Sequence, residues 1–183
     1  MIPIRWDEVV YEEREVIVEY RPQFRTFLHT HFIRPAYMLI GEYRHTIDDK
    51  NRLSLPAKFR KEMGKTVVVT PGLDSCLFVF TAKSWEKLSG SLSVSESSML
   101  SADKRSLNRY LLGGATEVPV DGAGRMLLSE HLREWGKLKS KVVLIGVRDR
   151  VEIWDEQLWQ SYRDNAAKNA EAVAEKLSSV GMI

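Results

Sequence analysis

The sequence has few of the features that mark secreted, membrane-spanning or strongly basic proteins. It contains one cysteine, so no disulfide can form within one chain, which is typical of a reducing cytoplasm. No apolar run approaches the roughly 20 residues that a membrane span needs. The first residues carry acids and aromatic side chains, unlike a signal peptide. The formal net charge is only +2, so a polyanionic partner would need a local cluster of basic residues.

Signatures of catalysis and of metal binding are absent from the sequence as well. There is no Gly-rich phosphate loop, no nucleophile elbow and no cluster of residues at metal-ligand spacing. The glycines of Gly122-Ala123-Gly124 indicate a hairpin turn, because no βαβ unit surrounds them. We therefore expect no enzyme activity, no cofactor, no metal and no small-molecule substrate. The lone Cys76 lies in an apolar run and is predicted to be a small core residue.

What the sequence does contain is a long internal repeat. Residues 46–60 recur as residues 119–133, an offset of 73 residues, and a repeat of long period sets the architecture of a chain. The matched pairs are Asp48 with Asp121, Arg52 with Arg125, Leu53 with Met126, Leu55 with Leu128 and Arg60 with Arg133. The apolar runs 67–70 and 77–80 likewise match 142–145 and 151–154. The sequence therefore predicts two tandem β-β-α-β-β-α units.

Local signals place the ends of the predicted helices. Pro56 suits the first position of a helix that extends to about residue 63, and Gly64 suits its C-terminal end. Ser129 is the N-cap type in the second unit, and Asp155 is the predicted N-cap of a helix that runs to about residue 177. Between the units we expect a helical turn at 85–88, a serine-rich break at 89–98 and a second helix that opens at Ser101.

The repeat also divides the chain into segments. We expect a leader at 1–37, a first unit at 38–84, a helical linker at 85–114, a second unit at 115–158, and a C-terminal helix and tail at 159–183. The leader has no counterpart in either unit, and Met38 stands immediately before the first one. We expect Met38 to be the native start, with a genuine N-terminal extension as the alternative. The mass of the endogenous protein distinguishes the two.

Basic residues cluster around the turn of the first unit. Lys50 and Arg52, followed by Lys58 and Arg60 on the predicted helix, place four cations within eleven residues. Lysine and arginine supply phosphate contacts to nucleic acids, and arginine suits bidentate contact with guanine in the major groove. The residues alone leave a second interpretation open, in which Asp48 pairs with Arg52, pins the turn and leaves no exposed cation.

The matching region of the second unit is poorer in charge. Ala123 stands where the first unit has a lysine, and Arg125 can pair with Asp121. Arg133 can pair with Glu130 at helical i,i+3 spacing. We therefore expect the first unit to carry a DNA-binding face and the second mainly to build the subunit and its assembly.

Residues 38 to about 176 resemble the bacterial MraZ family, whose members are built from two tandem AbrB-like (SpoVT-AbrB) units. The resemblance rests on Asp-x-x-x-Arg at 48–52 and 121–125, on Arg-Leu-Ser-Leu-Pro at 52–56, on Arg-Tyr-Leu-Leu-Gly-Gly-Ala at 109–115, and on Asp-Gly-Ala-Gly-Arg at 121–125. One departure is Asn51, where the family commonly has glycine. Asparagine also tolerates the left-handed conformation, so we expect the turn to survive.

The resemblance implies an α+β fold made of two swapped-hairpin β-barrel units of the AbrB type, related by a pseudo-twofold axis, with linker and C-terminal helices. It also implies a cytoplasmic, nucleoid-associated protein that forms ring-like homo-oligomers. Such proteins bind double-stranded DNA at tandem boxes in the promoter of the division and cell-wall gene cluster, usually as repressors of their own operon. On this basis the candidate DNA contacts are Arg52, Lys50, Lys58 and Arg60, and the candidate turn-orienting residues are Asp48, Asp121 and Arg125.

A protein-binding module is the alternative function, because AbrB-like domains also occur in antitoxins. An antitoxin is expected to have a single unit followed by a disordered inhibitory tail. This sequence has two units and a helical pattern at its C-terminus, which argues against that role. Inhibition of a partner enzyme remains compatible with DNA binding.

Overall fold

The computed structural model describes residues 38–93 and 101–181. The predictions about the leader and about a start at Met38 concern residues 1–37, which lie outside the described part of the chain. No helix within the described residues is long and apolar enough to cross a membrane.

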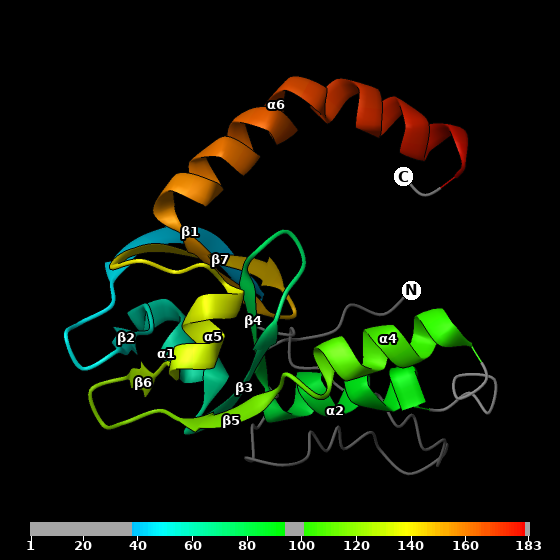
Figure 1. Cartoon of the computed structure of the whole chain (residues 1–183). Helices are drawn as coiled ribbons and strands as arrows, with labels where there is room; N and C mark the ends of the chain where they lie inside the picture. Colours follow the sequence, from blue (N-terminus) through cyan, green and yellow to red (C-terminus); the bar gives the residue numbers. More distant parts are fainter. Residues whose placement is uncertain (1–37, 94–100, 182–183) are drawn as a thin grey trace, which may run out of the picture. The chain divides into compact units, whose positions relative to one another are not determined.

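The two repeats have the same order of elements, as the sequence predicted (Figure 1). The first repeat consists of β1 (Leu39–Thr46), β2 (Arg52–Ser54), α1 (Ala57–Met63), β3 (Thr66–Pro71), β4 (Leu77–Thr81) and α2 (Ala82–Ser93). Helix α4 (Ala102–Leu111) leads into the second repeat. That repeat consists of β5 (Thr116–Pro119), β6 (Arg125–Leu127), α5 (Glu130–Trp135), β7 (Lys141–Arg148), β8 (Val151–Asp155) and α6 (Glu156–Ser179).

The strands show that the two repeats exchange parts. Six of them form one antiparallel sheet in the order β1-β7-β8-β4-β3-β5, and β2 pairs with β6 in a separate two-stranded ribbon. Strand β1 pairs with β7 from Leu39 opposite Arg148 to Thr46 opposite Lys141, and β5 pairs with β3. The first strand of each repeat therefore pairs with the third strand of the other repeat. The order of the sheet is symmetric about the contact between β8 and β4.

The exchange of strands accompanies an open sheet. Strands β1 and β5 are its outer members, and the described strands include no pairing between these two. The resemblance implied swapped-hairpin barrels, and a closed barrel is not confirmed. The structure shows a mixed fold of an antiparallel sheet, a small ribbon and helices.

The two repeats share one hydrophobic core. Leu53 and Met126 from the ribbon, Phe59 from α1 and Leu132 from α5 are all fully buried in the same cluster. The ring of Phe59 packs edge-on against Tyr43, with the ring centroids 5.0 Å apart. Because apolar side chains from one repeat cover those of the other, neither repeat has a complete core of its own.

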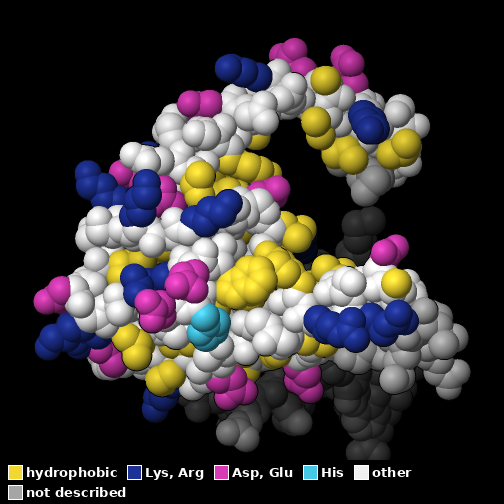
Figure 2. All heavy atoms as spheres, viewed as in Figure 1, with side chains coloured by type: hydrophobic (Ala, Val, Ile, Leu, Met, Phe, Trp, Pro, Cys, Tyr) yellow, Lys and Arg dark blue, Asp and Glu magenta, His cyan; other side chains and the backbone are white. Residues whose placement is uncertain are grey.

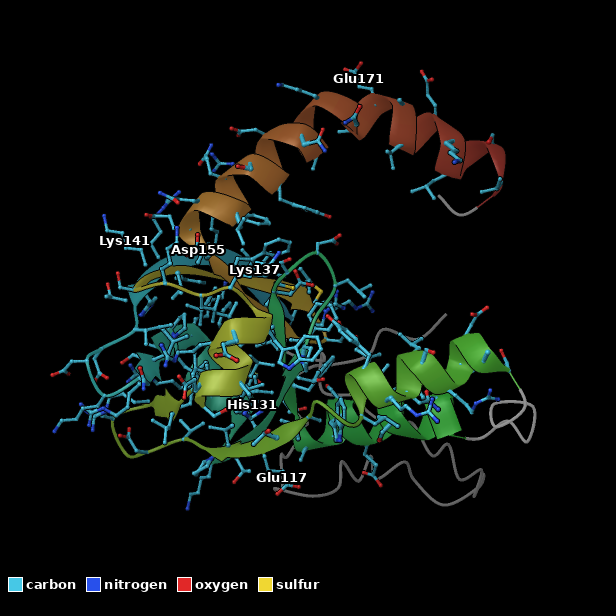
Figure 3. All side chains as sticks on the ribbon, in the orientation of Figure 1. Glu117, His131, Lys137, Lys141, Asp155 and Glu171 are labelled. Carbon is cyan, nitrogen blue, oxygen red and sulfur yellow. The ribbon has the colours of Figure 1, made fainter. Side chains whose placement is uncertain are left out.

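Most of the predicted helix ends are confirmed. Gly64 ends α1 at a φ of 75°, while Pro56 lies at the N-cap, one residue before the predicted position. Ser129 is the N-cap of α5, but its hydroxyl contacts His131 Nδ1 at 3.0 Å rather than the backbone. Asp155, labelled in Figure 3 where β8 passes into α6, accepts from the N–H groups of the next turn as an N-cap does.

The prediction of a break at 89–98 is wrong for its first residues. Helix α2 continues to Ser93, while residues 94–100 lie outside the described part. The serine hydroxyls bond back to the helix, with Ser89 Oγ donating to Glu86 O at 3.2 Å and Ser91 Oγ to Leu88 O at 2.7 Å. Serine can thus satisfy its hydroxyl inside a helix, so a serine-rich composition alone did not locate the end of α2. The predicted burial of Cys76 is confirmed.

Candidate nucleic-acid interface

The first turn, residues 48–52, is organised by the carboxylate of Asp48. Its Oδ1 accepts the backbone N–H groups of Lys50 at 2.9 Å and Arg52 at 2.8 Å, as aspartate does in tight turns. Its Oδ2 accepts Arg52 Nε at 2.8 Å and lies 2.7 Å from Arg52 Nη2. Asn51 adopts a left-handed φ of 59°, as expected for asparagine at this place. One carboxylate thus fixes both the turn and the direction of the arginine.

The second turn, residues 121–125, repeats this geometry. Asp121 Oδ1 accepts from the N–H groups of Ala123 and Arg125, both at 2.9 Å, and Asp121 Oδ2 accepts Arg125 Nε at 2.8 Å. Gly124 occupies the left-handed position with a φ of 78°. The predicted pairing of Arg125 with Asp121 is therefore present.

The ribbon brings the two arginines onto one face. Leu53 lies opposite Met126 in the register of β2 and β6, and both side chains point into the core. Because side chains alternate along a strand, Arg52 and Arg125 project from the opposite, outer face. Figure 1 shows the two turns on the same side of the molecule, and charged side chains of both signs gather at that edge in Figure 2.

Electrostatic contacts couple the two turns. The hydrogen bonds that Asp48 accepts from Arg52 lower the pKa of the Asp48 carboxyl, and those from Arg125 lower the pKa of the Asp121 carboxyl. The hydrogen bond to Asp48 raises the pKa of Arg52, and the charge of Asp121 in the other turn adds to that rise. Both carboxylates therefore remain ionised at neutral pH and hold the guanidinium groups in place.

Pairing with aspartate does not hide the arginines. About a third of the Arg52 side chain (32%) and of the Asp48 side chain (34%) stays exposed, although the two are paired. Each of the two interpretations that the sequence left open therefore agrees with part of the structure: Asp48 pairs with Arg52 and holds the turn, yet the arginine side chain remains accessible to solvent. An arginine that is already oriented by a carboxylate loses less conformational freedom on binding a ligand.

The other predicted cations lie nearby but differ in their surroundings. Lys50 on the turn and Lys58 on α1 are exposed. Arg60 is exposed overall, but its Nε donates to Leu55 O at 2.8 Å, a contact that sequence reasoning missed. Burial, followed by the charge of the Arg60 guanidinium, lowers the pKa of His45.

The predicted pairing of Arg133 with Glu130 in the second repeat is not among the ion pairs of the described residues. Within this part of the chain, Arg133 Nε is buried without a hydrogen-bond partner.

A shallow groove beside the second repeat was also not foreseen. It has a volume of about 440 Å³ and is lined by Tyr110, Trp135, His131 and neighbouring residues of the α4–β5 connection. The Trp135 ring packs edge-on against Tyr110 at 5.2 Å, yet 48% of Trp135 is exposed. Figures 2 and 3 place this hydrophobic surface beside His131. The aromatic residue alone gave no signal, because tryptophan is more often buried than exposed.

Comparison with known proteins agrees with the repeat. The family model for MraZ proteins, which its description also terms antitoxin-like, matches residues 38–110 and 111–179. A protein named Transcriptional regulator MraZ from Thermoanaerobacter sp. (strain X514) is 41% identical over 145 residues, which cover 79% of this chain and 100% of that protein. Proteins of the same name from Caldanaerobacter subterraneus subsp. tengcongensis and Moorella thermoacetica are 42% and 44% identical. They cover 78% and 76% of this chain and 98% and 96% of their own lengths.

These matches confirm the resemblance found in the sequence. The two matched segments contain one repeat motif each, so both turns, with Asp48 and Arg52 in one and Asp121 and Arg125 in the other, lie inside the matched region. The chain therefore belongs to the MraZ family.

Proposed function

We propose that the protein is a transcriptional regulator that binds double-stranded DNA through the outer face of the β2–β6 ribbon. The observation that carries the proposal is the presence of two arginines on that face, each aimed by an aspartate and each still partly exposed. The major groove of B-DNA is wide enough to admit a two-stranded β-ribbon, and arginine is the side chain that most often contacts guanine there. The names of the relatives support the same role.

The cations divide into two kinds of contact in this proposal. Arg52 approaches the base edges, while Lys50, Lys58 and the outer nitrogens of Arg60 approach the phosphates on either side. Asp48 and Asp121 orient the turns, and Arg125 stabilises the second one. The first repeat then supplies most of the affinity, because the second has Ala123 and His131 at the places of the two lysines.

We further propose that the target is a set of repeated boxes in the promoter of the protein's own operon, in the division and cell-wall gene cluster, and that binding represses transcription. A net charge of +2 gives a single subunit only modest attraction to DNA. Several subunits in a ring-like oligomer, bound to adjacent boxes, gain affinity through effective concentration. Such binding would associate the protein with the nucleoid.

A gel-shift titration tests this function. The protein should bind DNA from its own upstream region more tightly than random DNA of equal length, and the affinity should fall as salt rises because phosphate contacts release counterions. Measurements at two salt concentrations with random competitor DNA give both quantities. A well-assembled protein with no preference for its upstream DNA would contradict the proposal.

Exposed apolar side chains support the proposal of self-assembly. Trp135 borders the groove on one side of the molecule, and Tyr162 and Val173 lie exposed along α6, whose 24 residues include no buried one. Exposed apolar surface of this kind often marks a contact between subunits.

Trp135→Glu should reduce the size of the oligomer without unfolding the subunit. A charge at the centre of an apolar contact loses its hydration when subunits associate, so assembly becomes unfavourable. Light scattering coupled to size-exclusion chromatography measures the mass, and circular dichroism checks the fold. Lys137→Glu is the control, because Lys137 is exposed and lies two residues after Trp135 in the chain. This change of charge should leave the mass unaltered. An unaltered mass for the Trp135 variant would show that this surface takes no part in the contacts between subunits.

The antitoxin-like alternative is less well supported. It expects a disordered tail after a single unit, whereas α6 is a helix from Glu156 to Ser179 that follows two units. Binding to a partner enzyme would be a second activity of this protein rather than a replacement for DNA binding.

A further inference from the structure

Arg60 joins the first repeat to the turn of the second. The side chain starts from α1, and its Nε donates to Leu55 O at 2.8 Å. The guanidinium then lies against Gly124: a Cβ on that residue would overlap Arg60 Nε and stand 2.5 Å from Arg60 Cδ and 2.6 Å from Arg60 Cζ. Only a residue without a side chain leaves this room. Gly124 is accordingly buried although it lies in a turn.

The backbone closes the same contact. Leu55 N donates to Gly124 O at 2.8 Å, so Leu55 uses its N–H to hold the second turn and its carbonyl to hold Arg60. Three residues from two repeats therefore lock together. A shift of the second turn would break a backbone hydrogen bond and the packing of Arg60 at once.

The equivalent contact is missing on the other side of the pseudo-twofold axis. The backbone bond is present, since Leu128 N donates to Asn51 O at 2.9 Å, and Arg133 stands in the place that corresponds to Arg60. However, Asn51 carries the Cβ that Gly124 lacks, at a similar left-handed φ of 59°. Arg133 Nε is buried and has no hydrogen-bond partner in the described part of the chain. The departure from glycine at position 51 thus coincides with the loss of the matching arginine contact.

We infer that Arg60 is a positioning residue that braces the second turn across the two repeats, and that the first turn is left unbraced because Asn51 keeps Arg133 from the equivalent position. This inference rests on the proposed DNA binding for its functional meaning. A braced second turn holds Asp121 and Arg125 in place before DNA arrives, so little ordering is needed there on binding. The unbraced first turn, which carries Arg52, can adjust to the DNA.

The brace is tested by coupling Arg60 to Gly124. Arg60→Lys keeps the positive charge but removes the Nε donor and the planar group over Gly124. Gly124→Asn introduces the residue that the first turn already tolerates, together with the Cβ that displaces Arg60. Each variant should lower the melting temperature by about 2–4 °C. The double variant should be as stable as the less stable of the two single variants, because both changes remove the same contact. Additive losses, or an Arg60→Lys variant that behaves as the wild type, would overturn the brace.

The converse change should create the missing brace. Asn51→Gly removes the obstructing Cβ, so Arg133 can donate to Leu128 O as Arg60 does to Leu55 O. Part of any gain in melting temperature comes from relief at the left-handed φ, and this part does not involve Arg133. The informative quantity is therefore the difference in gain between the native background and Arg133→Ala. A larger gain with Arg133 present supports the inference, and an equal gain in both backgrounds overturns it.

DNA binding gives a readout that a merely structural contact would not move. Gly124→Asn changes no charge, so the salt dependence of binding should change by no more than the one phosphate contact of Arg60. The preference for upstream over random DNA should fall severalfold, by less than the loss expected for Arg52→Ala, once the second turn is no longer held in advance. An unchanged preference would show that the brace serves stability alone and would overturn its positioning role. The melting experiments need no DNA, so coupling between Arg60 and Gly124 in a protein without any DNA preference would refute the proposed function and not the brace.

Discussion

Arg52→Ala should abolish the preference for the upstream DNA while the protein still folds and assembles. A bidentate contact between arginine and guanine is worth about 1–3 kcal/mol of discrimination, or roughly 5- to 150-fold in affinity for each site. Linked subunits on adjacent boxes multiply the loss. The substitution leaves the core intact, because Leu53 and not Arg52 carries the buried face of β2. A gel-shift titration at two salt concentrations measures the loss, with melting temperature and oligomer mass as checks.

The carboxylate of Asp48 has to be separated from the arginine in this experiment. Removing Arg52 leaves Asp48 without its main partner, and an unpaired carboxylate near phosphate would itself repel DNA. The double variant Asp48→Ala, Arg52→Ala removes that repulsion. If Arg52 contacts the DNA directly, the double variant stays as weak in specific binding as the single one. Recovery of specific binding in the double variant would show that the loss came from the exposed aspartate.

Arg125→Ala is the matched control, because Arg125 has the same pairing with aspartate on the same face. We expect it to reduce DNA binding less than Arg52→Ala, since the lysines that flank Arg52 have no counterparts around Arg125. Equal losses with intact oligomers would mean that both repeats contribute alike to the DNA face, and that the proposed division between them is wrong.

The sequence predicted the elements of the fold well because its local signals are strong. Gly64 and Asp155 end and begin helices as their chemistry dictates, and the repeated motifs revealed the second copies of β2, β3 and β4. The same repeat made the pairing of strands hard to derive from the residues alone. Strands β3 and β7 are similar apolar runs, so either one could satisfy β1 by pattern. Only the resemblance to a family indicated an exchange.

The site was predictable in its residue types but not in its geometry. Asp48 and Arg52 lie four residues apart, so their pairing is a local matter that spacing suggests. The contact of Arg60 with Gly124 joins residues 64 positions apart and depends on the absence of one Cβ, which no periodicity encodes. The exposure of Trp135 is similarly a property of what the rest of the chain leaves uncovered. Long-range contacts of this kind require the folded structure.

Separation of the two repeats should abolish folding of either one as a monomer. Residues 38–100 contain the first repeat, yet β1 pairs with β7 and β2 with β6, both from the second. Without these partners, β3 and β7 each expose an unpaired edge, and the shared cluster around Phe59 and Leu132 is opened to water. Burial of fully enclosed apolar side chains contributes about 1.5–3 kcal/mol each, so the loss of several exceeds the stability of a typical domain.

Complementation provides the measurement. Fragments 38–100 and 101–183 should each show little cooperative unfolding by circular dichroism, and any folded form of one fragment should have the mass of a dimer in which two copies exchange strands. An equimolar mixture should recover the native spectrum and a cooperative transition, because it restores every strand pair and lacks only the covalent link between the two fragments. A fragment that folded as a stable monomer would show that one repeat can complete its own core. The exchange of strands would then be an incidental feature of the chain rather than the reason that its two repeats stay together.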